Sequence, residues 1–234
     1  MIDWKEIETV FLDMDGTLLD LHFDNHFWLE HVPKRYAEAH DLSFEDAKER
    51  LLARYKSVEG TLEWYCVDHW SRELGLDIAL LKEEVDHLIG VHPHVVDFLD
   101  GVRALGKRRV LVTNAHQKSL ALKLDRTHLR GHLDGVVCSH DLGYAKECPE
   151  FWGRLAFVEP FHRSRTLFVD DSPAVLASAR GYGIRWLLAV LRPDTRGPRR
   201  AQGDYAAIDD FSVLLPGIRA AATGSAGGSD STRS

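Results

Sequence analysis

Cysteine is scarce in this sequence, with three residues among 234, and no two of them form a C-x-x-C pair. The odd number and wide spacing of Cys66, Cys138 and Cys148 argue against a disulfide framework and a zinc ribbon. Long apolar runs are also missing: stretches such as 186–191 are far too short to span a bilayer, and no charged-then-apolar signal segment opens the chain. We therefore expect a cytoplasmic protein that is neither secreted by the usual route nor inserted in a membrane.

The sequence has no excess of positive charge. Its formal net charge is -7, and the lysines and arginines are dispersed rather than clustered. This distribution gives no electrostatic footprint for nucleic acid or for an anionic membrane, and no segment indicates a protein partner. With 44% apolar and 28% charged residues, the chain can bury a good core and form a second small domain.

Short apolar runs that end abruptly in polar residues are typical of buried parallel strands. Helix-length amphipathic segments lie between these runs, so the alternation predicts an α/β fold with a parallel sheet and helices on both faces. The polar strand ends should then meet at one rim, where open parallel sheets bind ligands. The expected strands are Thr9–Leu12, 109–112, Gly135–Cys138, 166–169 and 184–190, and the expected helices include 94–105, 118–126 and 149–157.

Residues 23–92 interrupt this alternation, because they have helical periodicity without a convincing buried strand. They predict an inserted α-helical domain between two parts of a core, 1–22 and 93–220. Within the insert, Leu62, Tyr65, Cys66, His69 and Trp70 are spaced as one face of a single helix. The small and polar residues at the end predict a disordered tail over 221–234.

Acidic residues follow two of the predicted strands. Asp13 and Asp15 lie two residues apart where a strand meets a loop, so one carboxylate could attack while the other transfers protons. Asp170 and Asp171 end another strand, and carboxylate oxygens are ligands that Mg²⁺ prefers. A divalent cation would also relieve the repulsion of four carboxylates at one rim. Asp171 has a second interpretation as the cap of the helix that Ser172 introduces.

Two other residues would complete a site for a phosphoryl group. Thr113 stands at a third strand end and offers a hydroxyl, and Lys146 follows a fourth strand and offers a fixed positive charge. Phosphoryl transfer needs in-line placement of the nucleophile and neutralisation of the charge on the equatorial oxygens. This combination of residue types favours phosphate chemistry.

Taken in order, these four motifs resemble the haloacid dehalogenase superfamily of aspartate-nucleophile phosphatases. The first motif, D-x-D-G-T, is met by 13–17, and the others are met by Thr113, by Lys146 and by the pair Asp170 and Asp171. The resemblance covers nearly all of the chain and implies a Rossmann-like core with an inserted helical cap. It also implies Mg²⁺ as cofactor and an aspartyl-phosphate intermediate.

The resemblance assigns a role to each of these residues. Asp13 would attack phosphorus, and Asp15 would protonate the leaving oxygen and then activate water. Magnesium would be held by Asp13, the main-chain carbonyl of Asp15 and Asp170, with Asp171 behind them. Lys146 would orient Asp13 and offset its charge. The phosphoryl group would be bound by Thr113, Lys146 and main-chain amides near Asn114.

The segments 18–21, 23–28, 64–66 and 113–116 further resemble a bacterial subgroup of GMP/IMP nucleotidases. That likeness implies a purine nucleoside monophosphate as substrate. The motifs themselves fix the reaction and not the leaving group, so sugar phosphates or other small metabolites, a phosphomutase, and a vestigial binding or regulatory module stay open.

Several aromatic and histidine residues have simpler interpretations. Trp28, Trp64, Tyr65 and Trp70 could stack on a purine, but we expect each of them to form part of the insert's core. His92 and His94 lack cysteines or carboxylates at ligand spacing, so we expect no zinc site there. His116 is a candidate for contact with substrate or for a helix start.

Overall fold

The computed structural model describes residues 2–226, and its centre is a parallel sheet of six strands in the order β3-β2-β1-β4-β5-β6. The predicted α/β fold with a parallel sheet is confirmed. The strands are β1 (Thr9–Leu12), β2 (Arg108–Thr113), β3 (Gly135–Cys138), β4 (Thr166–Asp170), β5 (Trp186–Val190) and β6 (Ala206–Ile208). The last of these was not predicted, because it is only three residues long and two of the three are alanines, which are uncommon in strands.

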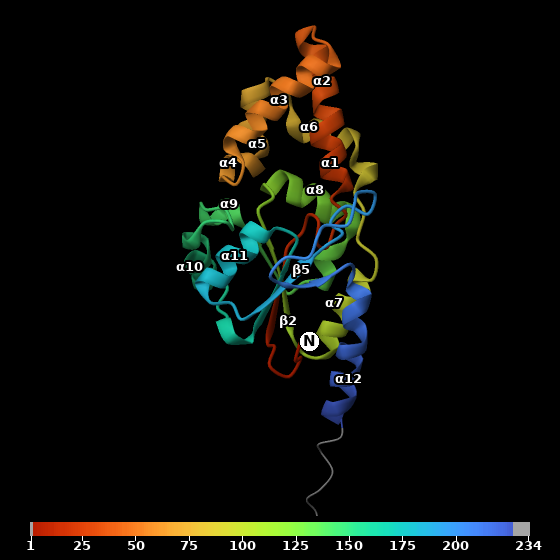
Figure 1. Ribbon diagram of the computed structural model, residues 1–234, viewed down its shortest axis with the longest axis vertical. Helices are drawn as coiled ribbons and strands as arrows, with labels where there is room; N and C mark the ends of the chain where they lie inside the picture. Colours follow the sequence, from red (N-terminus) through yellow and green to blue (C-terminus); the bar gives the residue numbers. More distant parts are fainter. Residues whose placement is uncertain (1, 227–234) are drawn as a thin grey trace, which may run out of the picture.

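The helices of the described residues fall into two groups (Figure 1). Those from the first part of the chain are α1 (His22–His26), a π-helix (Phe27–His31), α2 (Val32–His40), α3 (Phe44–Val58), α4 (Leu62–Tyr65), α5 (Val67–Leu74), α6 (Ile78–Glu84) and a 3-10 turn (Asp86–Leu88). Those interleaved with the strands are α7 (Val95–Ala104), α8 (Gln117–Thr127), α9 (Ser139–Leu142), α10 (Pro149–Val158), α11 (Pro173–Tyr182) and α12 (Leu215–Ala226), with 3-10 turns at Leu129–His132, Arg163–Arg165 and Phe211–Leu214.

Side chains alternate across the sheet and build a separate core on each face. Val10 and Leu12 of β1 belong to the cluster that contains residues of α7 and α12, whereas Phe11 belongs to the cluster of α10 and α11. Figure 1 shows these helix pairs on opposite sides of the strands. Strands buried on both faces are what the continuous apolar runs of the sequence predicted.

The helices between residues 22 and 88, called the helical insert below, have a third hydrophobic cluster of their own. Phe23, Phe27, Leu51 and Trp70 are buried in this cluster. In Figure 1 the insert extends beyond one end of the sheet. It therefore packs around its own core and faces the rim where the strands end.

Two local predictions are wrong. Residues 62–70 do not form one helix, because Cys66 has extended backbone angles (φ -84°, ψ 109°) and separates α4 from α5. Its Sγ accepts a hydrogen bond from the main-chain N–H of His69, at 3.3 Å, and so caps α5. The second wrong prediction concerns the tail, which we expected to be disordered from residue 221. Residues 221–226 instead belong to α12, which ends at Ala226; positions 227–234 lie outside the described residues.

No helix within residues 2–226 is long and apolar enough to cross a membrane.

Candidate active site

The register of the sheet places two predicted carboxylates side by side. Leu12 of β1 pairs with Val169 of β4, so the next residues, Asp13 and Asp170, are neighbours at the carboxyl ends of the two central strands. Their exposed fractions are 7% and 1%. Each carboxylate is therefore fixed by the end of a rigid strand and removed from most of the solvent.

Lys146 holds these two carboxylates together. Its ammonium group donates to Asp13 Oδ1 at 2.5 Å, to Asp170 Oδ2 at 2.7 Å and to the carbonyl oxygen of Val112 at 3.1 Å. The three protons of the ammonium thus have three acceptors, which fixes a positive charge beside Asp13. Burial lowers the pKa of Lys146, but Asp13 and Asp170 outweigh burial and hold the pKa above its ordinary value.

Asp171 completes a group of three carboxylates. Oxygen atoms of Asp13, Asp170 and Asp171 lie within 4.8 Å of one another. Asp171 does not cap the helix that follows, because the side chain of Ser172 accepts from the Val175 amide there. Its main-chain and carboxylate oxygens instead accept from Arg200 Nη1, at 2.7 and 3.0 Å.

The loop after Asp13 passes so close to Asp171 that it requires glycine. Gly16 has a φ of +82°, a backbone angle that residues with a side chain rarely adopt. A Cβ atom there would lie 2.8 Å from the carboxyl group of Asp171. The glycine of the first motif therefore allows two acidic loops to approach each other.

The electrostatics of this carboxylate group suit a divalent cation. Burial raises the pKa of Asp13 to about 7, that of Asp170 to about 6 and that of Asp171 to about 7, with neighbouring carboxylates adding to each shift. Lys146 and Arg200 oppose these shifts but do not cancel them. Three converging oxygen donors with excess negative charge fit Mg²⁺, which prefers such ligands.

Asp15 points its carboxylate at a different partner. Lys123 of α8 donates to Asp15 Oδ1 at 2.7 Å and to Asp24 Oδ2 at 2.6 Å, and Lys82 of the insert donates to Asp24 Oδ1 at 3.2 Å. This chain of four charges joins the core to the helical insert. Burial is the largest cause of the raised pKa of Asp15, and Lys123 opposes it.

Thr113 and Asn114 lie at the end of β2, as predicted, and both make hydrogen bonds within the protein. Thr113 Oγ1 accepts from the Ala115 amide at 3.0 Å, and Asn114 Oδ1 accepts from the Lys146 amide at 2.9 Å. Asn114 Nδ2 also donates to Glu147 at 2.9 Å, and Glu147 accepts from the hydroxyl of Tyr65 at 2.6 Å. Asn114 thus connects the Lys146 loop with the insert.

A cavity of about 690 Å³ opens beside these residues. Its core side is lined by the predicted site residues, and its other wall comes from the insert and includes Trp28, Tyr55, Trp64 and Tyr65. Trp28 and Tyr55 also contact Trp70, which is only 2% exposed. Trp28, Trp64 and Trp70 pack in the insert core, as expected, and they face the cavity as well. The expectation was wrong for Tyr65, which lies outside this hydrophobic cluster and donates to Glu147 of the core.

Sequence reasoning missed several charged residues of this site, namely Asp24, Lys82, Lys123, Glu147 and Arg200. Lys123 is separated from Asp15 by 108 positions and from Asp24 by 99. Each residue stands alone in an ordinary amphipathic helix or loop. No local pattern distinguishes it from a solvated surface charge.

Comparison with known proteins agrees with this geometry. The family model described as "haloacid dehalogenase-like hydrolase" matches residues 7–183. The chain is 40% identical over 217 residues to the GMP/IMP nucleotidase YrfG of Escherichia coli (strain K12), an alignment that covers 93% of this chain and 98% of that protein. It is 27% identical over 173 residues to a probable phosphoglycolate phosphatase of Pseudomonas putida, covering 72% of this chain and 68% of that protein.

Solved structures with the same fold include a HAD phosphatase from Thermococcus onnurineus, with a TM-score of 0.74 and 22% identity over 90% of this chain and 97% of that one. A putative beta-phosphoglucomutase from Thermotoga maritima has a TM-score of 0.64 and 19% identity, over 92% of this chain and 99% of that one. At such low identity these two structures support the fold alone.

Proposed function

The chain belongs to the haloacid dehalogenase-like hydrolases, and from that membership we propose that it is a Mg²⁺-dependent phosphomonoester hydrolase with Asp13 as its nucleophile. The observation that carries the proposal is the buried pairing of Asp13 with Lys146 at 2.5 Å, at the edge of a cavity of about 690 Å³. A carboxylate held by a fixed cation in a partly dry cavity is positioned to attack phosphorus.

In the first step, an oxygen of Asp13 forms a bond to phosphorus while the bond from phosphorus to the leaving oxygen breaks. Lys146 donates to Oδ1 and so restricts the rotation of the carboxylate. Asp15 gives its proton to the leaving oxygen. Because burial raises the pKa of Asp15, this group holds a proton more readily than an exposed aspartic acid does.

In the second step, water attacks the phosphorus of the aspartyl-phosphate, and Asp15 takes the proton of that water. The bond between phosphorus and Asp13 breaks, which releases phosphate and restores both carboxylates. Asp13, Asp170 and the Asp15 carbonyl would hold Mg²⁺, with Asp171 beside them, and the ion would supply positive charge for the phosphoryl oxygens. Thr113 and amides near Asn114 would bind the phosphoryl group.

We propose that the helical insert acts as a cap and that the substrate is a purine nucleoside monophosphate. Two observations support this substrate class. The cavity has an aromatic wall on the side of the insert, on which a base can stack. In addition, the relative that is 40% identical over nearly its whole length is named as a GMP/IMP nucleotidase.

A second candidate substrate class is favoured by the relatives named as phosphoglycolate phosphatases, which match 69–89% of this chain at 23–27% identity. Phosphoglycolate is a small substrate without a base. It would leave the aromatic wall of the cavity without a partner.

Phosphate release from IMP, GMP, AMP, ribose 5-phosphate and phosphoglycolate, with and without added Mg²⁺, tests the proposal. We expect turnover of IMP and GMP that requires Mg²⁺ and is lost in Asp13→Asn. Asp97→Asn, at a 70% exposed side chain of α7, is the matched control and should keep full activity. Strong turnover of phosphoglycolate or ribose 5-phosphate without turnover of IMP or GMP would contradict the substrate class, and near-normal activity of Asp13→Asn would contradict the nucleophile.

A further inference from the structure

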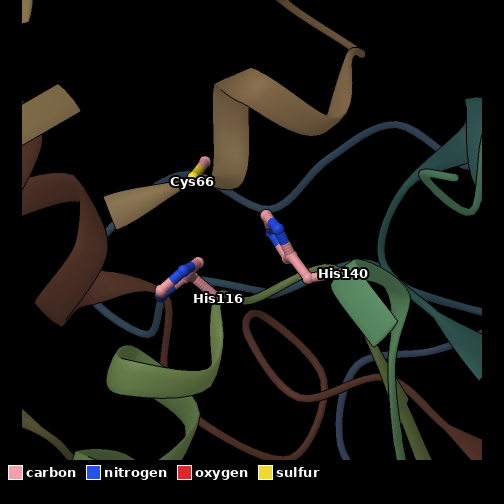
Figure 2. Close-up of side chains that lie close together, drawn as sticks. All are labelled: Cys66, His116 and His140. Carbon is pink, nitrogen blue, oxygen red and sulfur yellow. The ribbon is translucent and has the colours of Figure 1, made fainter. Parts of the chain in front are cut away.

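A second group of potential metal ligands lies where the helical insert meets the core. It consists of Cys66, between α4 and α5, His116, which precedes α8, and His140 of α9 (Figure 2). One ligand atom from each residue lies within 4.8 Å of the other two. Of the three, only His116 lines the cavity beside Asp13. The group is therefore distinct from the Asp13, Asp170 and Asp171 carboxylates.

His140 has a free lone pair in a buried position. Its Nε2 is inaccessible to solvent and has no hydrogen-bond partner within residues 2–226. Burial lowers the pKa of this ring, and a main-chain contact at Asn114 opposes the shift; because Nε2 has no partner in this part of the chain, this contact lies at the other nitrogen, Nδ1. A carbonyl that binds Nδ1–H leaves Nε2 as an acceptor, which is the usual arrangement of a metal-ligating histidine.

His116 has a matching arrangement. Its Nδ1 accepts only a long hydrogen bond, 3.3 Å, from the Lys118 amide, and its Nε2 lies 3.6 Å from Asp68 Oδ2. The proton of the neutral ring therefore belongs on Nε2, facing a carboxylate, and Nδ1 carries the lone pair. A cation bound at Nδ1 would replace its long hydrogen bond with the Lys118 amide. Carboxylates in this outer position orient histidines at many zinc sites.

The two rings and the thiol together form a neutral donor set. The ring centroids of His116 and His140 are 5.0 Å apart. Burial is the largest cause of the lowered pKa of each ring, so both rings remain uncharged at neutral pH. Cys66 is a free cysteine, and the contact of its Sγ with the His69 amide at 3.3 Å still allows coordination. Thiolate sulfur and imidazole nitrogen are the ligands of Zn²⁺ rather than of Mg²⁺.

We propose that Cys66 Sγ, His116 Nδ1 and His140 Nε2 bind one Zn²⁺ ion, with water as the fourth ligand, and thereby fasten the helical insert to the core. On binding, the thiol of Cys66 releases its proton to solvent and its sulfur bonds to the ion; no electron transfer is involved. Tetrahedral zinc places its ligand atoms about 3.3–3.8 Å apart. The ligand atoms already lie within 4.8 Å of one another, so small side-chain movements bring them to this spacing.

Titration of the reduced, metal-free full chain with Co²⁺ in excess Mg²⁺ tests the site. The excess magnesium keeps Co²⁺ away from the carboxylates around Asp13. A thiolate-to-cobalt absorption band appears only when sulfur coordinates the cobalt ion. We expect one equivalent of Co²⁺ to produce this band and one equivalent of Zn²⁺ to abolish it. Cys66→Ser should remove the band, and its hydroxyl can still cap α5. Cys148→Ser, at the other half-buried free cysteine, should retain it.

His140→Gln tests the second ligand by competition of Zn²⁺ with a fluorescent chelator. Loss of a ligand should weaken zinc binding by about 100-fold or more, given that loss of an outer partner alone costs about 10–100-fold. Zinc should also slow hydrogen exchange of the α5 amides in the wild type and not in Cys66→Ser. A cobalt–sulfur band that survives Cys66→Ser, the absence of zinc binding under excess Mg²⁺, or unchanged exchange in α5 would overturn the proposal. None of these measurements depends on phosphatase activity.

Discussion

Lys123 of α8 donates a hydrogen bond of 2.7 Å to Asp15, the residue that we propose as the general acid. The side chain of Lys123 is 2% exposed, and the same ammonium donates to Asp24 of the helical insert at 2.6 Å. Asp15 and Asp24 therefore share one buried cation. The proposed general acid in the core is thus linked directly to the insert.

Lys123→Met should destabilise the protein by about 3–5 kcal/mol, because it removes the buried cation that Asp15 and Asp24 share and leaves Asp15 without an ion-pair partner. It should also raise the pKa of Asp15, since Lys123 is the main influence that lowers it. The basic limb of the pH–rate profile, where the general acid loses its proton, should then move to higher pH. Urea denaturation and kcat measured from pH 5 to 9 check the two effects.

Lys118→Met on the same helix is the control for Lys123→Met. Lys118 pairs with Asp68 at the surface, so its loss should change stability much less. The double variant Lys123→Met/Asp15→Asn should recover part of the lost stability, because Asp15 loses its ion-pair partner with Lys123, whereas Asp24 keeps Lys82. Equal stabilities of Lys123→Met and Lys118→Met would contradict a structural role for the buried pair.

Asp13 and Asp170 could be placed together from the sequence, because each directly follows a buried strand and parallel strands end at one rim. The family and the hydrolase class followed from the order of the motifs and are confirmed. Lys146 could be proposed from its place after a strand end, but a single lysine in a loop has no pattern of its own, so its specific role came from the resemblance. Its contacts with Asp13 and Asp170 agree with the role that the resemblance implies, which stays a prediction.

The insert was less predictable than the sheet. In a buried strand, the residue at which the apolar run ends marks where that strand meets the rim of the sheet. An amphipathic helix shows only which of its faces is apolar. Spacing alone could not reveal that the helix is interrupted at Cys66, because the interruption depends on the extended backbone of that one residue. The ion pairs of Lys123 and the meeting of Cys66 with His116 and His140 join distant segments, so they exist only in the folded chain.

Asp13→Asn should lower kcat by on the order of 10⁴-fold or more, because the amide oxygen is a poor nucleophile. The same change should increase the stability of the metal-free protein by on the order of 1–3 kcal/mol at pH 8. Asp13 is buried beside Asp170 and Asp15, both of which oppose its ionisation, while an amide can still accept from Lys146. Thermal unfolding in EDTA measures the gain, and a loss of stability would show that Lys146 depends on the full charge of Asp13.

Magnesium should stabilise the protein more at pH 8 than at pH 5. Burial raises the pKa of Asp13 to about 7, of Asp170 to about 6 and of Asp171 to about 7, from an ordinary value of 3.8. The folded protein therefore binds these protons more tightly than the unfolded chain does, and the stability they contribute below pH 4 is lost as the pH rises through 6–7.

Mg²⁺ binds the ionised carboxylates, so it compensates for this loss above pH 7 and competes with protons at pH 5. The rise in Tm on adding Mg²⁺ at the two pH values measures the effect. Asp170→Asn, which removes one ligand, should reduce the rise at pH 8. An equal rise at both pH values would contradict a magnesium site built from these carboxylates.

Tyr55→Phe should separate recognition of the base from the chemistry at phosphorus. The hydroxyl of Tyr55 is buried at the wall of the cavity and has no hydrogen-bond partner in the described part of the chain. Burial also raises the pKa of this phenol, which keeps its proton. GMP and IMP both carry a carbonyl oxygen at C6 that can accept from it. The variant should lower kcat/KM for IMP by about 10-fold, the value of one hydrogen bond, and leave ribose 5-phosphate unchanged.

The free Tyr55→Phe protein should be as stable as the wild type or more so, because an unpaired buried hydroxyl is removed. Tyr36→Phe is the matched control: Tyr36 is 6% exposed in the same hydrophobic cluster and does not line the cavity. Kinetics with IMP and ribose 5-phosphate, together with Tm, test both variants. An equal loss for the two substrates in Tyr55→Phe would mean that Tyr55 shapes the insert rather than binds the base.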